Sequence, residues 1–332
     1  MQSFGRPRST TNPYIHMLDA ALAQSSEVEH VRFSRRRALL GRYDALHFHW
    51  PETLFGGTTR PRAIARRAFA VALRIRLSLT RAAVVRTVHN VEPHAGPTPW
   101  ERRYLAWLDR RTDHRILLNA HTPLEPGVAA TVIPHGHYRD WFAAVPRVEP
   151  VPGALGFVGL IRPYKGVEEL LDAFTATAGS APGLSLRIAG NPASDALARD
   201  LRARAAADPR VELDLRYLSE EDFATAVLAC SGIVLPYRRM LNSGAVLAAL
   251  SLDRPVLVPR TEVNAALARE VGPGWISTFD GPLTARELVA FAAATARAPS
   301  APPDLAARGW REVGARHRAV FRQAVAARRG RR

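Results

Sequence analysis

Short apolar runs rich in β-branched residues alternate with amphipathic or alanine-rich stretches along the chain, and this alternating series occurs twice. Strands that alternate with helices predict βαβ units and parallel sheets. A proline-rich stretch at residues 145–153 separates the two series. The sequence therefore predicts an α/β protein built from two doubly wound parallel-sheet domains.

The expected elements are short, as is usual for such domains. In the first series we expect strands at 28–33, 45–50, 82–89, 114–119 and 130–135, and helices at 13–23, 65–79 and 100–111. In the second we expect strands at 155–161, 184–190, 211–217, 231–237 and 255–260, and helices at 166–178, 195–207, 219–229, 244–252 and 284–297. Residues 305–330 are expected to form one long basic helix. Few residues precede the first helix, so either the first strand is very short or the given start lies late.

Composition fits this interpretation. The 332 residues are 47% hydrophobic and 23% charged, as expected for two globular domains. No apolar run is long enough to span a bilayer, and the start lacks the apolar core of a secretory signal, so we expect a cytoplasmic protein. Cys230 is the only cysteine, which excludes an intrachain disulfide and a cysteine metal cluster.

The chain carries a net charge of +16, of which +10 falls in residues 1–150. Nucleic acid, an anionic membrane or phosphorylated substrates could each explain this excess. Nucleic acid fits poorly, because the arginines are spread along the whole chain and no nucleic-acid-binding signature is present. Lys165 is the only lysine among 46 basic residues, so it is more informative than any single arginine.

Ligands of open α/β sheets bind where strands end and helices begin. Arg162 and Lys165 follow the run 155–161 and precede a helix, and two cations there suit a diphosphate. The alternative for Arg162 and Lys165 is a solvated turn with two surface charges. For the turns at residues 191 and 242–245, the alternative is an ordinary helix entry or cap. The further donor-binding candidates are Gly159, Asn191, Tyr237, Asn242, Ser243, Gly244 and Ala245.

Histidines and acidic residues gather after the expected strands of the first half. His47 and His49 share one face of their strand, but a metal site there lacks an evident third ligand. Such clusters are suited to general acid–base catalysis and to recognition of sugar hydroxyls. The alternative is that these polar side chains only hydrogen-bond to one another and stabilise the loops. The other candidates in this half are Trp50, Glu52, His89, Glu92, His94, His135 and His137, the last two near a cleft expected between the domains.

These segments resemble a known group of enzymes. Residues 157–174 resemble the segment that opens the C-terminal domain of many bacterial GT-B glycosyltransferases, and residues 235–259 resemble their donor-diphosphate loop and helix. Residues 87–94 resemble the histidine motif of their first domain. Residues 47–52 and 133–138 resemble segments of a bacterial polysaccharide-assembly branch.

The resemblance implies the GT-B fold, in which two Rossmann-like domains face each other across a cleft. The expected domains are 1–147 on the acceptor side and 148–303 on the nucleotide-sugar side. A terminal helix at 304–332 is expected to pack back on the first domain.

The resemblance also implies transfer of a sugar from a nucleotide-sugar, UDP- or GDP-linked, to a saccharide or lipid-linked acceptor. Arg162 and Lys165 would neutralise the leaving diphosphate, and the backbone N–H groups of residues 243–245 would hold it. His89 would face the donor sugar. No metal or other cofactor is expected, because no Asp-x-Asp triplet is present and cations with a helix dipole can neutralise a diphosphate.

The chain departs from the group's usual pattern at three positions. Leu160 stands where an arginine is usual, and Met240 and Ala248 stand where the large retaining family carries two glutamates. The stereochemistry therefore stays open. An inverting enzyme would need a base near the acceptor hydroxyl, and the candidates are His89, Glu92 and Glu52.

Two other functions stay open at this point. One is a non-catalytic GT-B-like partner protein, which the missing glutamates favour. The other is a GT-B-fold epimerase, which would act on a nucleotide-sugar without an acceptor. The basic stretch 60–81 suggests an enzyme that lies peripherally on the inner face of an anionic membrane, with an ordinary solvated helix face as the alternative.

Overall fold

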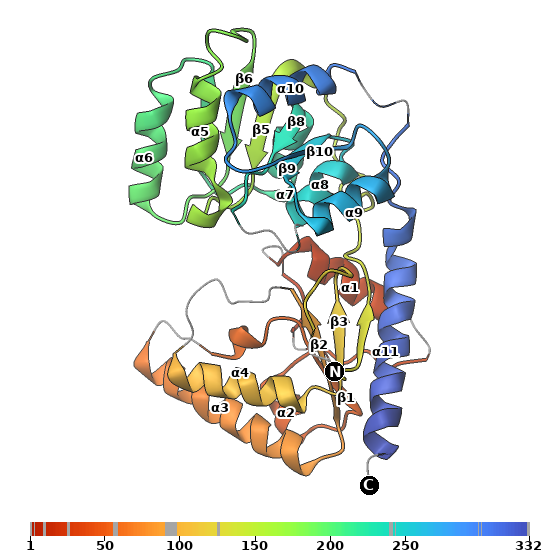
Figure 1. The fold of residues 1–332 in the computed structure, drawn as a ribbon. Coiled ribbons are helices and arrows are strands. Elements are labelled where there is room, and N and C mark those ends of the chain that lie inside the picture. Colours follow the sequence, from red (N-terminus) through yellow and green to blue (C-terminus); the bar gives the residue numbers. More distant parts are fainter. Residues whose placement is uncertain are drawn as a thin grey trace. The chain divides into compact units, whose positions relative to one another are not determined.

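The computed structural model describes residues 2, 4–8, 11–24, 27–55, 59–89, 98–124, 127–238, 242, 244–297, 299 and 301–330. The chain folds into two compact units, each with its own parallel sheet (Figure 1). Unit 1 comprises Met1–Gly136 and Arg308–Arg332, and unit 2 comprises His137–Ala307. The domain boundaries expected from the sequence, at 147/148 and 303/304, stay a prediction, because a division by contacts does not test which segments fold independently.

The sheet of unit 1 has the strand order β1-β2-β3-β4, and all its pairings are parallel. Its strands are β1 (Ala45–Phe48), β2 (Ala83–Val88), β3 (His114–Leu117) and β4 (Ala130–Val132). Its helices are α1 (Pro13–Ala23), α2 (Arg35–Leu40), the 3-10 turn η1 (Pro51–Leu54), α3 (Arg60–Leu79), α4 (Pro99–Arg111) and α11 (Trp310–Gly330). Helices α3 and α4 lie on one side of the sheet and α11 on the other (Figure 1).

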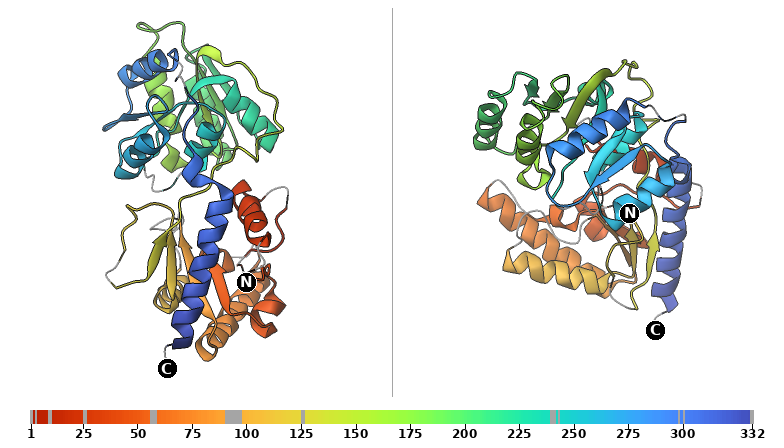
Figure 2. Two further views of the ribbon diagram at one scale, coloured as in Figure 1. Left: turned by 90° about the vertical axis from the view of Figure 1, so that its right-hand side faces the viewer. Right: turned by 45° about the horizontal axis from the view of Figure 1, so that its top comes forward.

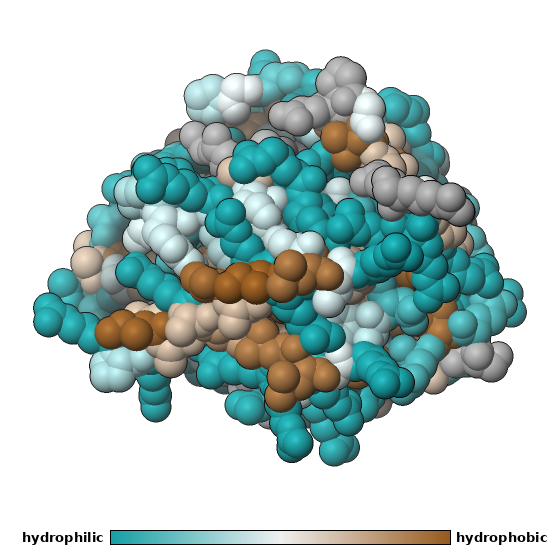
Figure 3. Space-filling model, turned by 90° about the horizontal axis from the view of Figure 1, so that it is seen from below, coloured by the Kyte–Doolittle hydropathy of each residue, from teal (hydrophilic) through white to brown (hydrophobic). Residues whose placement is uncertain are grey.

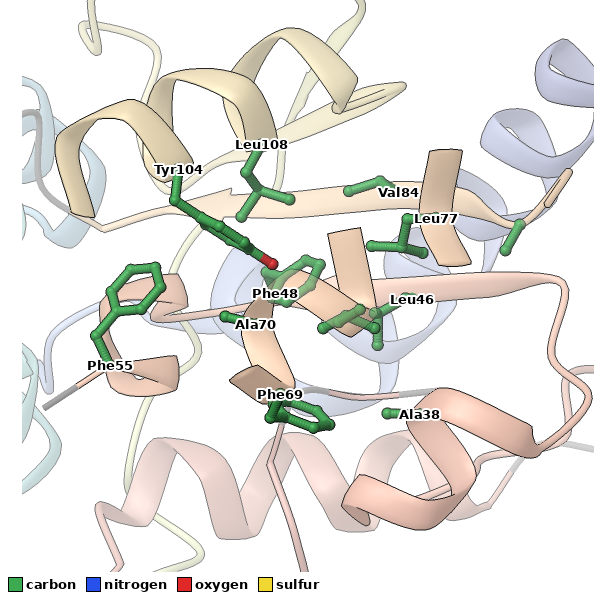
Figure 4. Close-up of a cluster of buried hydrophobic side chains, with 12 residues drawn as sticks. Ala38, Leu46, Phe48, Phe55, Phe69, Ala70, Leu77, Val84, Tyr104 and Leu108 are labelled. Atoms are coloured by element: carbon green, nitrogen blue, oxygen red, sulfur yellow. The ribbon is translucent and has the colours of Figure 1, made fainter. Parts of the chain in front are cut away.

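The alternation of side chains along β1 explains these two layers. Leu46 and Phe48 point into a fully buried cluster with Ala70 of α3 and Tyr104 of α4 (Figure 4). Because successive side chains of a strand point to opposite faces, His47 faces the other layer, where its ring lies 5.2 Å from that of Phe321 on α11. The β1 strand therefore places an apolar core on one face and a histidine on the other.

Helix α11 returns the end of the chain to unit 1 and packs against α1 and β2. Its buried side recurs at helical spacing, which is the pattern of an amphipathic helix: Trp310, Val313, His317, Val320, Phe321 and Ala324. Arg322 and Arg329 form ion pairs with Glu27 (2.8 Å) and Asp44 (2.6 Å). Exposed pairs of this kind contribute little, so the buried apolar side holds the helix in place.

The sheet of unit 2 has the order β10-β9-β8-β5-β6-β7 and carries helices on both faces (Figure 2). Its strands are β5 (Val151–Val158), β6 (Ser185–Ala189), β7 (Val211–Asp214), β8 (Cys230–Val234), β9 (Val256–Pro259) and β10 (Ile276–Phe279). Its helices are α5 (Val167–Thr175), α6 (Asp195–Ala205), α7 (Glu220–Leu228), α8 (Gly244–Ser251), α9 (Glu262–Val271) and α10 (Ala285–Thr295). Two 3-10 turns, η2 (Pro163–Lys165) and η3 (Ala306–Arg308), complete the elements.

The structure corrects two of the expected elements. Residues 28–33 form no strand; they are an extended segment whose Val31 carbonyl accepts a hydrogen bond from Gln2 N (2.9 Å). Gln2 in turn forms a parallel bridge with His47, so the first-strand position beside β1 is occupied by a very short segment. The long terminal helix begins at Trp310 and not at residue 305, because the 3-10 turn η3 precedes it.

Candidate active site

The donor-side candidates of unit 2 lie where the strand order reverses. From β5 the chain runs to β6 and β7 on one side, and from β8 to β9 and β10 on the other. The turns after β5 and β8 therefore lie at the switch point, where open α/β sheets bind ligands. The first of these turns carries Arg162 with Lys165 and the second carries Tyr237 and Arg238, so the topology brings the two candidate turns together.

Glycines allow the strand ends of β5 and β6 to approach closely. A Cβ on Gly190 would lie 1.8 Å from the carbonyl oxygen of Gly159, and both residues have positive φ. The carbonyl oxygen of Asn191 accepts hydrogen bonds from Ile161 N (3.0 Å) and from the Arg162 guanidinium (3.1 Å). Asn191 thus supports the turn through its backbone.

Lys165 lies between two aromatic rings directly before α5. Its Nζ atom lies 5.0 Å from the ring centre of Tyr237 and 5.9 Å from that of Phe157. Within the described part of the chain, neither Lys165 nor Arg162 forms an ion pair. Burial, and then the repulsion from Arg162, lower the pKa of Lys165 to about 8. This turn therefore holds two cations without acidic partners at a helix N-terminus, which is a suitable environment for a diphosphate.

The second turn is fastened to the first. Arg238 N donates a hydrogen bond to the carbonyl oxygen of Tyr164 (2.9 Å), and the Arg238 side chain pairs with Glu169 on α5. A Cβ on Gly166 would lie 2.4 Å from the carbonyl oxygen of Pro236, so only glycine permits this approach. Sequence reasoning missed Arg238, because its partner lies 69 positions away.

The remaining donor-side candidates lie at the start of α8. Gly244 and Ala245 are its first two residues, and Asn242 is partly buried just before it. Ser243 lies outside the described residues.

The histidine candidates of unit 1 gather after the ends of neighbouring strands. His49 and Trp50 follow β1, His89 follows β2, and His135 follows β4. Carboxyl ends of parallel strands meet at one edge of a sheet, which is why these positions converge.

The contacts confirm that these side chains form one cluster. His49 Nδ1 lies 3.2 Å from His89 Nε2, and the Trp50 ring stacks on His89 with ring centres 4.6 Å apart. His47 Nε2 lies 2.8 Å from Thr87 Oγ1 on β2, beneath His49. His47 and His49 thus share an environment, as their spacing predicts.

Three members of this cluster were not identified from the sequence. The Tyr14 ring of α1 lies 4.5 Å from that of His135 and 5.6 Å from that of His89. His317 of α11 lies 5.7 Å from His47, and Trp310 lies 5.4 Å from Tyr14. The available signal was that His317 is the only histidine after residue 137 and lies on the apolar face of its helix.

Gly136 explains part of the segment 133–138. A Cβ at this position would lie 2.4 Å from the Trp310 indole, so the glycine lets that ring pack against the backbone.

Burial keeps the imidazoles of the cluster neutral. Desolvation lowers the pKa of His89 to about 3 and the pKa values of His135 and His317 to about 4. It also lowers the pKa values of His47 and His49 well below the usual value. At neutral pH these side chains therefore act as uncharged hydrogen-bonding groups.

The other candidates lie outside this cluster or outside the described residues. Glu52 is exposed in η1, two residues after Trp50. His137 belongs to unit 2, where its Nδ1 accepts a hydrogen bond from Arg139 N (3.3 Å). Glu92 and His94 lie outside the described residues.

A cavity of about 1080 Å³ lies elsewhere in unit 1. Asp44, Ala45 and Ala82 line it, so it opens at the amino ends of β1 and β2, away from the strand ends that carry His89. His47 of the histidine cluster also lines it, whereas His49, Trp50, His89 and His135 do not. Within the described residues, no three His, Cys, Asp or Glu side chains are grouped to hold a metal ion.

Two curated relatives share most of the chain. A protein of Xanthomonas campestris pv. campestris (strain ATCC 33913), named GDP-mannose:glycolipid 4-beta-D-mannosyltransferase, is 44% identical over 321 residues, which are 96% of this chain and 90% of the relative. A second protein from the same pathovar has the same name, identity and coverage. No protein-family model matches the chain.

Solved structures match the fold. HepE from Anabaena, in complex with UDP, has a TM-score of 0.54 at 14% identity. The match covers 86% of this chain and 78% of the HepE chain. A structure described as trehalose-6-phosphate from E. coli, bound with UDP-2-fluoro glucose, has a TM-score of 0.55 at 14% identity. The match covers 93% of this chain and 79% of the E. coli chain. The predicted parallel α/β architecture of GT-B type is thereby confirmed. The chain is a glycosyltransferase, and it belongs to the family of the Xanthomonas GDP-mannose:glycolipid 4-beta-D-mannosyltransferases.

Proposed function

We propose that this enzyme transfers mannose from GDP-mannose to a hydroxyl group of a glycolipid and forms a β-linkage. The 44% identity to relatives of that name, over 96% of the chain, carries the proposal. Arg162 and Lys165, which form no ion pair with any described residue, support a nucleoside-diphosphate donor. Because a glycolipid acceptor lies in a membrane, this function also supports an enzyme that works at a membrane surface. The location of the enzyme on the cytoplasmic side of that membrane stays a prediction.

The stereochemistry of the reaction follows from this proposal. GDP-mannose carries its mannose through an α-linkage to phosphate, so a β-product requires inversion at C1. The acceptor oxygen forms its bond to C1 as the bond from C1 to the phosphate oxygen breaks, and GDP leaves with the electron pair. The acceptor proton passes to a base. Inversion fits a chain that lacks the two glutamates of the retaining family at Met240 and Ala248.

Lys165 and Arg162 would stabilise the leaving diphosphate. Negative charge grows on the phosphate oxygens as the bond to C1 breaks, and preorganised cations stabilise that charge most in the transition state. The N-termini of α5 and α8 add partial positive charge. These groups supply the neutralisation that a metal ion provides in other transferases, so we propose a metal-independent reaction.

Glu52 is the base that we propose among the three candidates. A general base must accept a proton in the transition state, and burial makes that unfavourable for His89, whose pKa is about 3. Glu52 is exposed and follows β1 at the edge that carries the histidine cluster. His89 and Trp50 would instead bind sugar through neutral hydrogen bonds and ring contacts, with His49 packed against His89.

The product tests this function. The purified enzyme, GDP-mannose and a glycolipid acceptor that ends in a free sugar hydroxyl are expected to give a β-linked mannoside, identified by the carbon–proton coupling at C1. GDP-glucose and UDP-glucose serve as controls. Activity is expected to persist in EDTA. An α-linked product would refute inversion, and no transfer from GDP-mannose would refute the donor.

Lys165→Met is expected to weaken GDP binding by roughly 10- to 150-fold, because one charge-assisted contact is lost, worth about 1.5–3 kcal/mol. Titration calorimetry measures this. Arg204→Met removes one positive charge from α6, where the arginine pairs with Asp172 and Asp200, and is expected to leave GDP affinity within about twofold. Equal losses in both variants would mean that general charge, and not the turn after β5, binds the nucleotide.

A further inference from the structure

An apolar stripe runs along the outward side of α3. Ile64, Val71, Ile75 and Leu79 are 67%, 43%, 54% and 81% exposed. Their spacing of seven, four and four residues places them on one face of the helix, opposite the buried Phe69, Leu73 and Leu77. Leu40 at the end of α2 is 77% exposed as well. Figure 3 shows exposed apolar side chains gathered as a band across one face of the molecule.

Arginines accompany this stripe and acidic residues do not. The 20 residues of α3 include six arginines and no Asp or Glu. Arg67 and Arg74 are exposed and lie over the indoles of Trp100 (5.6 Å) and Trp107 (5.2 Å) of α4. Apolar side chains beside arginines and tryptophans are the composition of helices that lie in the plane of a bilayer interface. Within the described residues, no helix is long and apolar enough to cross a membrane.

We propose that this outward face of α3, with Leu40 and the flanking Trp100 and Trp107, docks on an anionic phospholipid surface. The proposal deepens the proposed function, because a glycolipid acceptor lies in such a surface. Ile64, Val71, Ile75 and Leu79 enter the acyl boundary, and Arg67 and Arg74 contact lipid phosphates. Charge complementarity selects this occupant over a second copy of the chain, whose identical arginines would face one another.

The test is flotation of the full chain with vesicles of phosphatidylcholine, with or without phosphatidylglycerol. We expect binding to the mixed vesicles and weak binding to phosphatidylcholine alone. Val71→Glu with Ile75→Glu is expected to weaken binding by more than about tenfold, because two charges replace inserted apolar groups. Arg67→Gln with Arg74→Gln is expected to weaken it on the order of fivefold per arginine. The matched control, Val148→Glu with Val151→Glu, changes two exposed valines of unit 2 and is expected to bind as the wild type does.

Three outcomes would contradict the proposal. Unchanged binding in the Val71→Glu, Ile75→Glu variant would exclude this surface, and equal binding to both vesicle types would exclude the role of the arginines. A wild-type dimer in lipid-free solution that this variant dissociates would show that the stripe is a self-interface. Transfer to a water-soluble acceptor analogue is expected to be equal in the variant and the wild type. Vesicle binding without any transfer would refute the proposed function and leave the surface standing.

Discussion

Glu52→Gln is expected to lower kcat for mannosyl transfer by about 10²- to 10⁴-fold, the usual effect of removing a general base. The glutamine keeps the size and the hydrogen-bonding reach of the side chain but cannot take the acceptor proton. Glu52 is exposed in η1, so the change leaves no buried group unpaired. GDP affinity is expected to be unchanged, because the cations proposed to hold the diphosphate lie in unit 2. Steady-state kinetics and calorimetry on the same preparation separate the two effects.

Two further variants make this result specific. Glu29→Gln makes the same change at an exposed glutamate that lines the cavity at the opposite edge of the sheet, and it is expected to leave kcat within about twofold. His89→Gln is expected to raise KM more than it lowers kcat, because a neutral imidazole binds sugar hydroxyls without taking their proton. Full activity in the Glu52→Gln variant would show that another group acts as the general base.

The position of the candidate donor turn can be predicted from the sequence for a topological reason, and its role in donor binding stays a prediction. Ligands bind at strand ends near a switch point whatever the details of packing, so Arg162 and Lys165 can be identified from their position directly after one strand. Their supporting contacts are long-range. The hydrogen bond from Arg238 N to Tyr164 O and the approach of Gly166 to Pro236 depend on how two distant turns meet, and no local pattern encodes that.

The histidine cluster is only half predictable. His47, His49, His89 and His135 follow strands or lie on them, so their convergence follows from a parallel sheet. Tyr14 and His317 come from helices near the two ends of the chain, and their rings join the cluster only because α1 and α11 pack together.

The extended segment 28–33 shows the limit of strand propensity. Its β-branched and aromatic residues Val28, Val31 and Phe33 favour a strand, yet the segment pairs only briefly, with Gln2 and Phe4. Tertiary context overrides a propensity that reflects half-buried packing more than the backbone itself.

The cluster also makes unit 1 acid-sensitive. His89, His135 and His317 have pKa values of about 3, 4 and 4 because burial disfavours the imidazolium form. A histidine of the unfolded chain titrates near pH 6.5. Between these values the unfolded chain binds protons that the folded unit does not, so stability is fully present above about pH 6.5 and falls as the pH drops.

The expected size of this loss is large. At pH 5 each of the three histidines costs about 2 kcal/mol relative to neutral pH, or about 6 kcal/mol together. His47 and His49, whose pKa values are also lowered, add to the loss. A domain is stable by only about 5–15 kcal/mol. We therefore expect unit 1 to unfold between pH 6 and 5, and hydrogen exchange followed by mass spectrometry locates the opening. Unit 2 contains one histidine, His137, and is expected to keep its protection.

His317→Phe isolates the cause. The ring is fully buried, His317 Nδ1 donates to the carbonyl oxygen of Val313 within the same helix, and Nε2 lacks a partner in the described structure. An apolar ring of similar size therefore forfeits one hydrogen bond and removes one titrating group. The slope of unfolding free energy against pH between 6 and 5 is expected to fall by nearly one proton, about 1.4 kcal/mol per pH unit. His121→Gln changes an exposed histidine and is expected to leave the slope unaltered. If His317→Phe and the wild type lost stability in parallel, His317 would not contribute to the acid sensitivity, and the lowered pKa of its imidazole would lose its support.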